Sequence, residues 1–103
     1  MTPPTTNPST QTILARHRAA ALFAAAARSE QAGPGAQLHC LAAVTALHAP
    51  TGPVPAAIDA LDPDQLIQAA LRLLAGLDLD DFSHPEVLTA SRHGRRALLE
   101  PRP

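Results

Sequence analysis

The chain has 103 residues and a formal net charge of −1 at neutral pH, with eight arginines and no lysine. This length allows one hydrophobic core, and the charge balance excludes a bulk positive field that would draw the chain to nucleic acid or an anionic membrane. Cys40 is the only cysteine, which excludes an internal disulfide and a multi-cysteine zinc site and fits a cytoplasmic protein. The longest apolar run, residues 19–27, is too short to span a bilayer.

The apolar residues are an unusual set. They make up 46% of the chain, but 22 are alanines, and Phe23 and Phe82 are the only aromatic residues. A core of this composition is thin and aliphatic, so it releases little free energy against the entropy cost of ordering the backbone. We therefore expect marginal stability, or support from a second copy of the chain.

The pattern along the chain predicts helices and no strands. Residues 1–9 contain three prolines and no apolar side chain after Met1, which predicts a flexible tail. Residues 10–100 are predicted to form a single helical domain, followed by a short tail at 101–103. No alternating run is long enough for a sheet. The predicted fold is all-α, an antiparallel bundle of about four helices with a short extra helical turn, in which helices adjacent in sequence are neighbours in space.

Two helices are predicted in the first half of the chain. The first begins near Ser9 or Thr10 and ends near residue 32, where Gly33 and Pro34 stop it. The second runs from Pro34 to about His48, before a segment rich in proline and glycine. Its predicted apolar stripe is Leu38, Cys40, Leu41, Val44 and Leu47. A further turn of helix over residues 55–60 would cover one end of the core.

The first predicted helix has apolar side chains on two opposite faces. On a helical wheel, Leu22 and Phe23 lie about 180° from Ile13 and Leu14. Three arrangements remain open: the helix bends, it is buried centrally in its own monomer, or its second half docks on another molecule. We expect Leu22 and Phe23 to belong to a surface for self-association or partner binding.

The third helix has the clearest boundaries. Asp62 and Gln65 form a capping box, Pro63 occupies the first helical position, and Gly76 is placed to end the helix. Its apolar residues form one continuous arc: Leu66, Ile67, Ala70, Leu71, Leu73, Leu74 and Leu77. This arc predicts a helix at the centre of the core.

The fourth helix is predicted to begin with a second capping box, formed by Ser83 and Glu86 around Pro85. Its predicted inner face is Val87, Leu88, Ser91, Gly94 and Leu98, with small residues at 91 and 94 that would let another helix approach closely. The preceding segment, residues 76–83, contains three aspartates but lacks the spacing of a calcium-binding loop, so we expect a solvated connector.

The cysteine and the five histidines are the natural candidates for catalysis or metal binding. Cys40 and His48 are about 12 Å apart along a helix, too far for a nucleophile and its base. No two histidines are three or four residues apart, so no pair on one helix face can hold a metal ion. A site assembled from different helices remains open. We expect Cys40 to be a buried thiol and His48 to line the end of the second helix.

The C-terminal end is basic, with Arg92, His93, Arg95, Arg96 and Arg102. Cations at a helix C-terminus interact favourably with its macrodipole, which would explain these residues without a ligand. The alternatives are binding to an acidic protein surface or to nucleic acid. A nucleic-acid reader usually adds stacking aromatic residues or a recognisable helix-turn-helix, and neither is found in the sequence.

The sequence therefore favours a non-catalytic protein–protein interaction or accessory protein that forms a homodimer or binds another protein. The alternative is a small regulator that binds an anionic partner, acidic protein or nucleic acid, through its arginine-rich C-terminal helix. A third possibility is a bundle that binds a small apolar ligand beside His48. No enzyme motif, cofactor site or metal site is implied. The candidate partner-binding residues are Leu22, Phe23, Arg92, Arg95 and Arg96.

Overall fold

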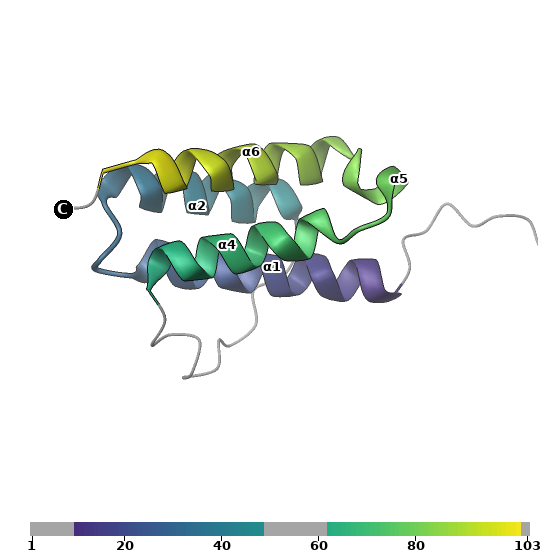
Figure 1. Cartoon of the computed structure of the whole chain (residues 1–103), viewed down its shortest axis with the longest axis horizontal. Helices are drawn as coiled ribbons and strands as arrows, with labels where there is room; N and C mark the ends of the chain where they lie inside the picture. The colour runs from purple at the N-terminus through teal and green to yellow at the C-terminus, as the bar shows by residue number, and fades with distance from the viewer. Residues whose placement is uncertain (1–9, 49–61, 102–103) are drawn as a thin grey trace, which may run out of the picture.

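The computed structural model describes residues 10–48 and 62–101, and these form helices without any strand. The helices are α1 (Thr10–Arg28), α2 (Pro34–Leu47), α4 (Pro63–Ala75), α5 (Leu79–Phe82) and α6 (Pro85–Leu99) (Figure 1). The predicted all-α bundle of four long helices is confirmed. The short helix α5 was not predicted and lies in the segment expected to be a connector. The turn predicted at 55–60 and the tail predicted at 1–9 lie outside the described residues.

The four long helices form a bundle in which each helix packs against two of the others. The closely packed pairs are α1 with α2, α1 with α4, α2 with α6 and α4 with α6. In Figure 1, α1 and α6 run in one direction and α2 and α4 in the other, so each of these pairs is antiparallel. The predicted antiparallel packing is therefore confirmed. The expectation that helices adjacent in sequence are neighbours is wrong for α2 and α4, which occupy a diagonal, because α4 begins at the opposite end of the bundle from where α2 ends.

The middle of α1 is buried inside the monomer. Phe23 is fully buried and Leu22 is 8% exposed, whereas Ile13 and Leu14 are 40% and 46% exposed. The prediction that Leu22 and Phe23 form a contact surface is therefore wrong. The reason is that α1 packs against both α2 and α4, and its alanines let these helices approach closely.

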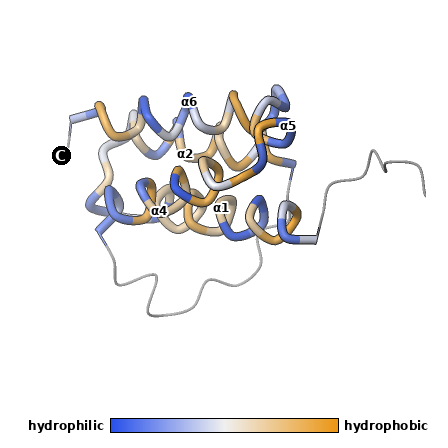
Figure 2. The backbone as a smooth tube through the Cα atoms, turned by 45° about the vertical axis from the view of Figure 1, so that its right-hand side comes forward, coloured by the Kyte–Doolittle hydropathy of each residue, from blue (hydrophilic) through white to orange (hydrophobic). Residues whose placement is uncertain are grey.

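The helix α4 is the best-predicted element. The side chain of Asp62 accepts a hydrogen bond from the Asp64 backbone N–H, and the Gln65 side chain accepts one from the Asp62 backbone N–H, which confirms the capping box. The core side of α4 carries Leu66, Ile67, Ala70 and Leu74. Figure 2 shows polar and apolar residues alternating along the turns of α4 and α6, as expected for helices with one buried face.

The start of α6 differs from the prediction. Its N-cap is His84, and no side chain caps it. The hydroxyl of Ser83 instead donates to the Leu79 carbonyl at 2.7 Å and closes α5, while Glu86 binds Arg16. The prediction of a second capping box is therefore wrong, because both of its members have other partners in the folded chain. The inner face of α6 is Val87, Ala90, Ser91, Gly94 and Ala97.

The buried face of α2 also departs from the predicted stripe. Cys40 and Leu47 are buried as expected, but Leu38 is 67% exposed and Leu41 is 52% exposed. The buried positions, 36, 40, 43 and 47, follow a spacing of four and three residues, and this face packs against α1 and α6. Leu38 and Leu41 point away from it.

Candidate functional site

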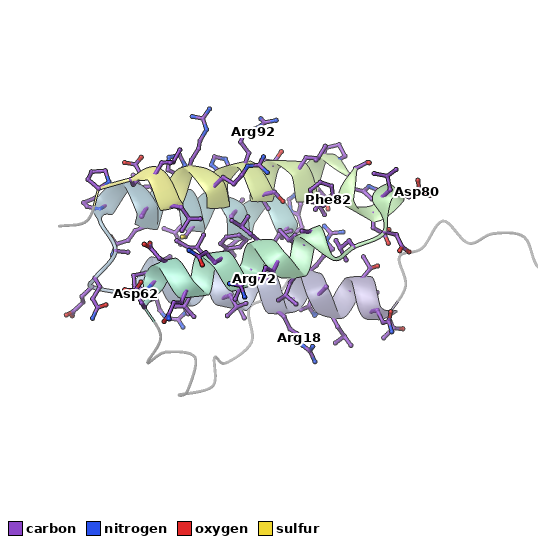
Figure 3. The ribbon with its side chains drawn as sticks, in the orientation of Figure 1. Arg18, Asp62, Arg72, Asp80, Phe82 and Arg92 are labelled. Carbon is purple, nitrogen blue, oxygen red and sulfur yellow. The ribbon has the colours of Figure 1, made fainter. Side chains whose placement is uncertain are left out.

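The outer side of α6 carries an exposed row of side chains that we call the arginine face: Leu88, Arg92, Arg95, Arg96 and Leu99. All five are exposed. Residues 88, 92, 95 and 99 are spaced by four, three and four residues, which places them in one stripe. Figure 3 shows Arg92 on the outer side of α6. Within the described part of the chain, none of the three arginines has a hydrogen bond or an ion pair with another residue.

The helix macrodipole explains only part of the arginine face. Its effect is confined to the last turn of a helix, and Arg96 is the basic residue of that turn in α6. Arg92 and Arg95 lie before it. The macrodipole therefore does not account for these two residues, and their side chains are accessible to a partner.

A second exposed surface lies on α2, and we call it the leucine face: Leu38, Leu41 and Thr45. All three side chains are exposed. The whole of α2 contains no aspartate, glutamate, lysine or arginine. An uncharged helix face with two exposed leucines is a surface that another molecule can cover without desolvating a charge.

A histidine pair joins α2 to α6 beside the arginine face. The Nδ1 atoms of His39 and His93 are 3.1 Å apart, and their ring centroids are 5.3 Å apart. A carboxylate oxygen of Glu100 lies 3.4 Å from Nε2 of His39. Glu100 fits there because it lies over Gly35, where a Cβ atom would come within 2.6 Å of the carboxyl group. Sequence reasoning missed this cluster, because the two histidines are 54 residues apart and no local spacing marks them.

The surroundings of His93 favour its uncharged imidazole. Partial burial lowers the pKa of His93, and the nearby His39, Arg96 and Arg92 lower it further. Each of these effects disfavours an additional positive charge on the ring. In the described residues, no group of three or more His, Cys, Asp or Glu side chains is placed to hold a metal ion.

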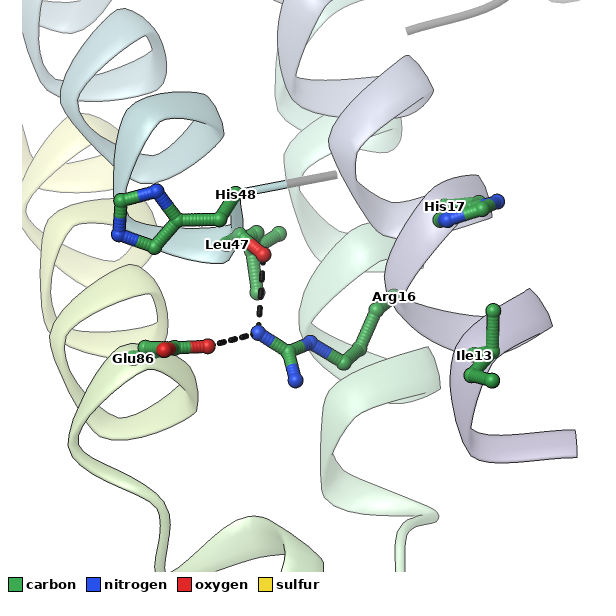
Figure 4. A pocket seen from close by; sticks show the side chains of 6 residues that line it. All are labelled: Ile13, Arg16, His17, Leu47, His48 and Glu86. Atoms are coloured by element: carbon green, nitrogen blue, oxygen red, sulfur yellow. Dashed lines mark hydrogen bonds and ion pairs between the residues drawn. The ribbon is translucent and has the colours of Figure 1, made fainter. Parts of the chain in front are cut away.

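A pocket of about 280 Å³ lies where α1, α2 and α6 meet (Figure 4). Its lining residues are Ile13, Arg16, His17, Leu47, His48 and Glu86. Arg16 donates hydrogen bonds to the Leu47 carbonyl at 2.9 Å and to the Glu86 carboxylate. Because the paired Arg16 and Glu86 line the pocket, it does not match the leucine-lined site expected of a bundle that binds an apolar ligand.

The geometry around Arg16 indicates a structural role. Its guanidinium lies at the C-terminal end of α2, where carbonyls carry partial negative charge, and pairs with a carboxylate in the first turn of α6. The hydrogen bond from Arg16 lowers the pKa of Glu86. His48, predicted to line this end of α2, is its C-cap in a left-handed conformation with φ of 49°.

Cys40 is a buried thiol, as predicted. Its side chain is fully buried, and burial raises its pKa to about 12. A thiol with this pKa is protonated at neutral pH and is a poor nucleophile.

The comparisons with known proteins assign no relative. No protein-family model, no curated protein and no solved structure matches this chain. Within the described residues, no helix combines the length and the apolar character needed to cross a membrane.

Proposed function

We propose that this chain is a non-catalytic interaction protein that binds an acidic segment of a partner protein through the arginine face. The observation that carries the proposal is the exposure of Arg92, Arg95 and Arg96 without an internal hydrogen bond or ion pair among the described residues. Guanidinium groups bind carboxylates through paired, charge-assisted hydrogen bonds. The exposed Leu88 and Leu99 at the two ends of the stripe add apolar contacts.

An acidic peptide suits this face better than nucleic acid does. The net charge of the chain is −1, so the positive charge is local and does not extend over the molecule. The face also contains no aromatic side chain on which a base could stack. A short acidic segment needs only a local basic stripe.

The test is binding of a fluorescently labelled aspartate-rich peptide, measured by anisotropy. We expect the double variant Arg92→Gln/Arg95→Gln to bind at least about tenfold more weakly, because two charge-assisted contacts are lost. Affinity should also fall as salt rises from about 50 to 300 mM, since exposed charges are screened.

The matched control is Arg18→Gln/Arg72→Gln, which removes the same charge from exposed positions on α1 and α4 (Figure 3). This control should bind within about twofold of the native chain. If both double variants lose the same affinity for the peptide, the effect arises from net charge alone, and the arginine face is not the binding surface. Tighter binding of a single-stranded oligonucleotide than of the peptide would favour a nucleic-acid regulator instead.

We also propose self-association, now assigned to the leucine face rather than to Leu22 and Phe23. The specific observation is the absence of charged residues from α2, together with its exposed Leu38 and Leu41. A face without charge does not repel its own copy, so two copies can pair about a twofold axis.

Light scattering tests this proposal. We expect a dimer for the native chain and a folded monomer for Leu38→Gln/Leu41→Gln. The control is Leu79→Gln/Leu99→Gln, because these leucines are 79% and 85% exposed and lie on α5 and α6. A native monomer at high concentration would rule out the leucine face as a dimer interface.

A further inference from the structure

The histidine pair lies against the arginine face and shares its electrostatics. His93 lies on α6 between Arg92 and Arg96 in sequence and is half-buried against His39 of α2. Both arginines act on the charge state of His93. A ligand that neutralises these arginines must therefore also change the proton affinity of the imidazole.

We propose that the arginine face is a proton-linked anion site, in which a bound acidic peptide and a proton on His93 stabilise each other. This inference rests on the proposed function and adds its regulation. Its consequence is that affinity for an acidic partner rises as the pH falls from about 7.5 to about 5.5, the range in which histidines titrate.

The contacts of the pair indicate which nitrogen takes up the proton. The carboxylate of Glu100, 3.4 Å from Nε2 of His39, favours a hydrogen on that nitrogen. Nδ1 of His39 is then bare and accepts a hydrogen bond from Nδ1 of His93 at 3.1 Å. The remaining basic nitrogen is Nε2 of His93, which has no hydrogen-bond partner among the described residues.

Without a ligand, the positive groups that act on His93 all disfavour its protonation. From α2 it faces His39, and from its own helix it faces Arg92 and Arg96. Glu100 lies on the far side of His39 and is the only nearby carboxylate of the cluster in the described residues. The helix α4 packs on a different flank of α6, marked by the contact of Gly94 with Leu71, and α5 precedes the start of α6.

A bound carboxylate weakens the repulsion between the two arginines and a protonated His93. It compensates the positive charge of Arg92 and Arg96, so the charged form of His93 is less disfavoured, while the effects of burial and of His39 remain. Because binding and protonation are linked, the factor by which the peptide raises proton affinity equals the factor by which the proton raises peptide affinity. The proton thus adds one cation to the binding surface.

The test measures binding of the labelled aspartate-rich peptide at about pH 7.5 and about pH 5.5, where aspartate stays ionised. We expect the native chain to bind roughly two- to fivefold more tightly at the lower pH, the size of one added exposed ion pair. His93→Gln should lose this difference, since glutamine can keep a hydrogen bond to His39 without titrating. The control His84→Gln, an exposed histidine at the start of α6, should retain it.

A second readout is the pKa of His93 followed by NMR with and without the peptide. We expect the peptide to raise this pKa, which a merely structural histidine pair would not show. Binding that is the same at both pH values, or an unchanged His93 pKa in the saturated complex, overturns the proton link and leaves the proposed function intact. Absence of peptide binding at both pH values overturns both proposals.

Discussion

At position 94 of α6, a hydrogen atom stands where most residues carry a Cβ atom, and the core depends on it. A Cβ there would lie 2.8 Å from Cδ2 of Leu71 and 2.9 Å from Cε1 of Phe23. We expect Gly94→Ala to lower the free energy of unfolding by about 1–3 kcal/mol through overpacking, although alanine is the better helix former. Urea unfolding followed by circular dichroism measures this change. Gly76→Ala is the control, because its Cβ would meet no atom closer than 3.5 Å; equal stabilities for both variants would contradict the close approach.

The thiol of Cys40 reports on the opening of the same core. It is fully buried and protonated, with its pKa raised to about 12 by burial. We expect negligible reaction with an aromatic disulfide reagent under native conditions and fast reaction in urea, because only the exposed thiolate reacts. The rate of thiol modification, followed by absorbance, gives the result. Rapid modification of the native chain would show that α2 opens locally.

At the scale of the helices, Arg16 of α1 joins three elements, because it binds both the Leu47 carbonyl of α2 and the Glu86 carboxylate of α6. The pKa of Glu86 is lowered, so its contribution to stability is present above the unfolded pKa of about 4.3 and is lost as the pH falls through the folded value. We expect Glu86→Gln to cost about 1 kcal/mol near pH 7, a value limited by the partial exposure of the pair. The cost should be smaller near pH 3, because protonation of Glu86 weakens its contact with Arg16. Urea unfolding at the two pH values measures it, and Glu30→Gln, an exposed glutamate outside the contact, should show no such pH-dependent difference.

The helix boundaries show how far local signals reach. The start of α4 was predictable because a capping box needs only residues within one turn. The start of α6 was not, because Glu86 is held by Arg16, 70 residues away. In α2, sequence spacing identified Cys40 and Leu47 as buried, but it could not show that Leu38 and Leu41 point outward, since that depends on where α1 and α6 pack.

At the scale of the whole molecule, the sequence predicted the class of fold and its antiparallel packing, but not which helices are neighbours. Four helices joined by short connections imply an antiparallel bundle, whereas the placement of α2 and α4 on one diagonal depends on the end of the bundle at which α4 begins. The candidate site was likewise predictable only in part. The exposure of Arg92, Arg95 and Arg96 follows from their spacing on one helix, but the histidine pair exists only because α2 and α6 are neighbours.

The size of the hydrophobic core decides whether a single copy of the chain is stable on its own. Phe23 is the only fully buried aromatic residue in the described part, and most other core positions of α1 are alanines. If a second copy covers the leucine face, it stabilises the native state by mass action, so the melting temperature must rise with protein concentration. We expect a rise of several degrees over about a hundredfold concentration range, measured by scanning calorimetry. The Leu38→Gln/Leu41→Gln variant should melt at one concentration-independent temperature, and the same independence in the native chain would show that the alanine-rich core is sufficient in a single copy.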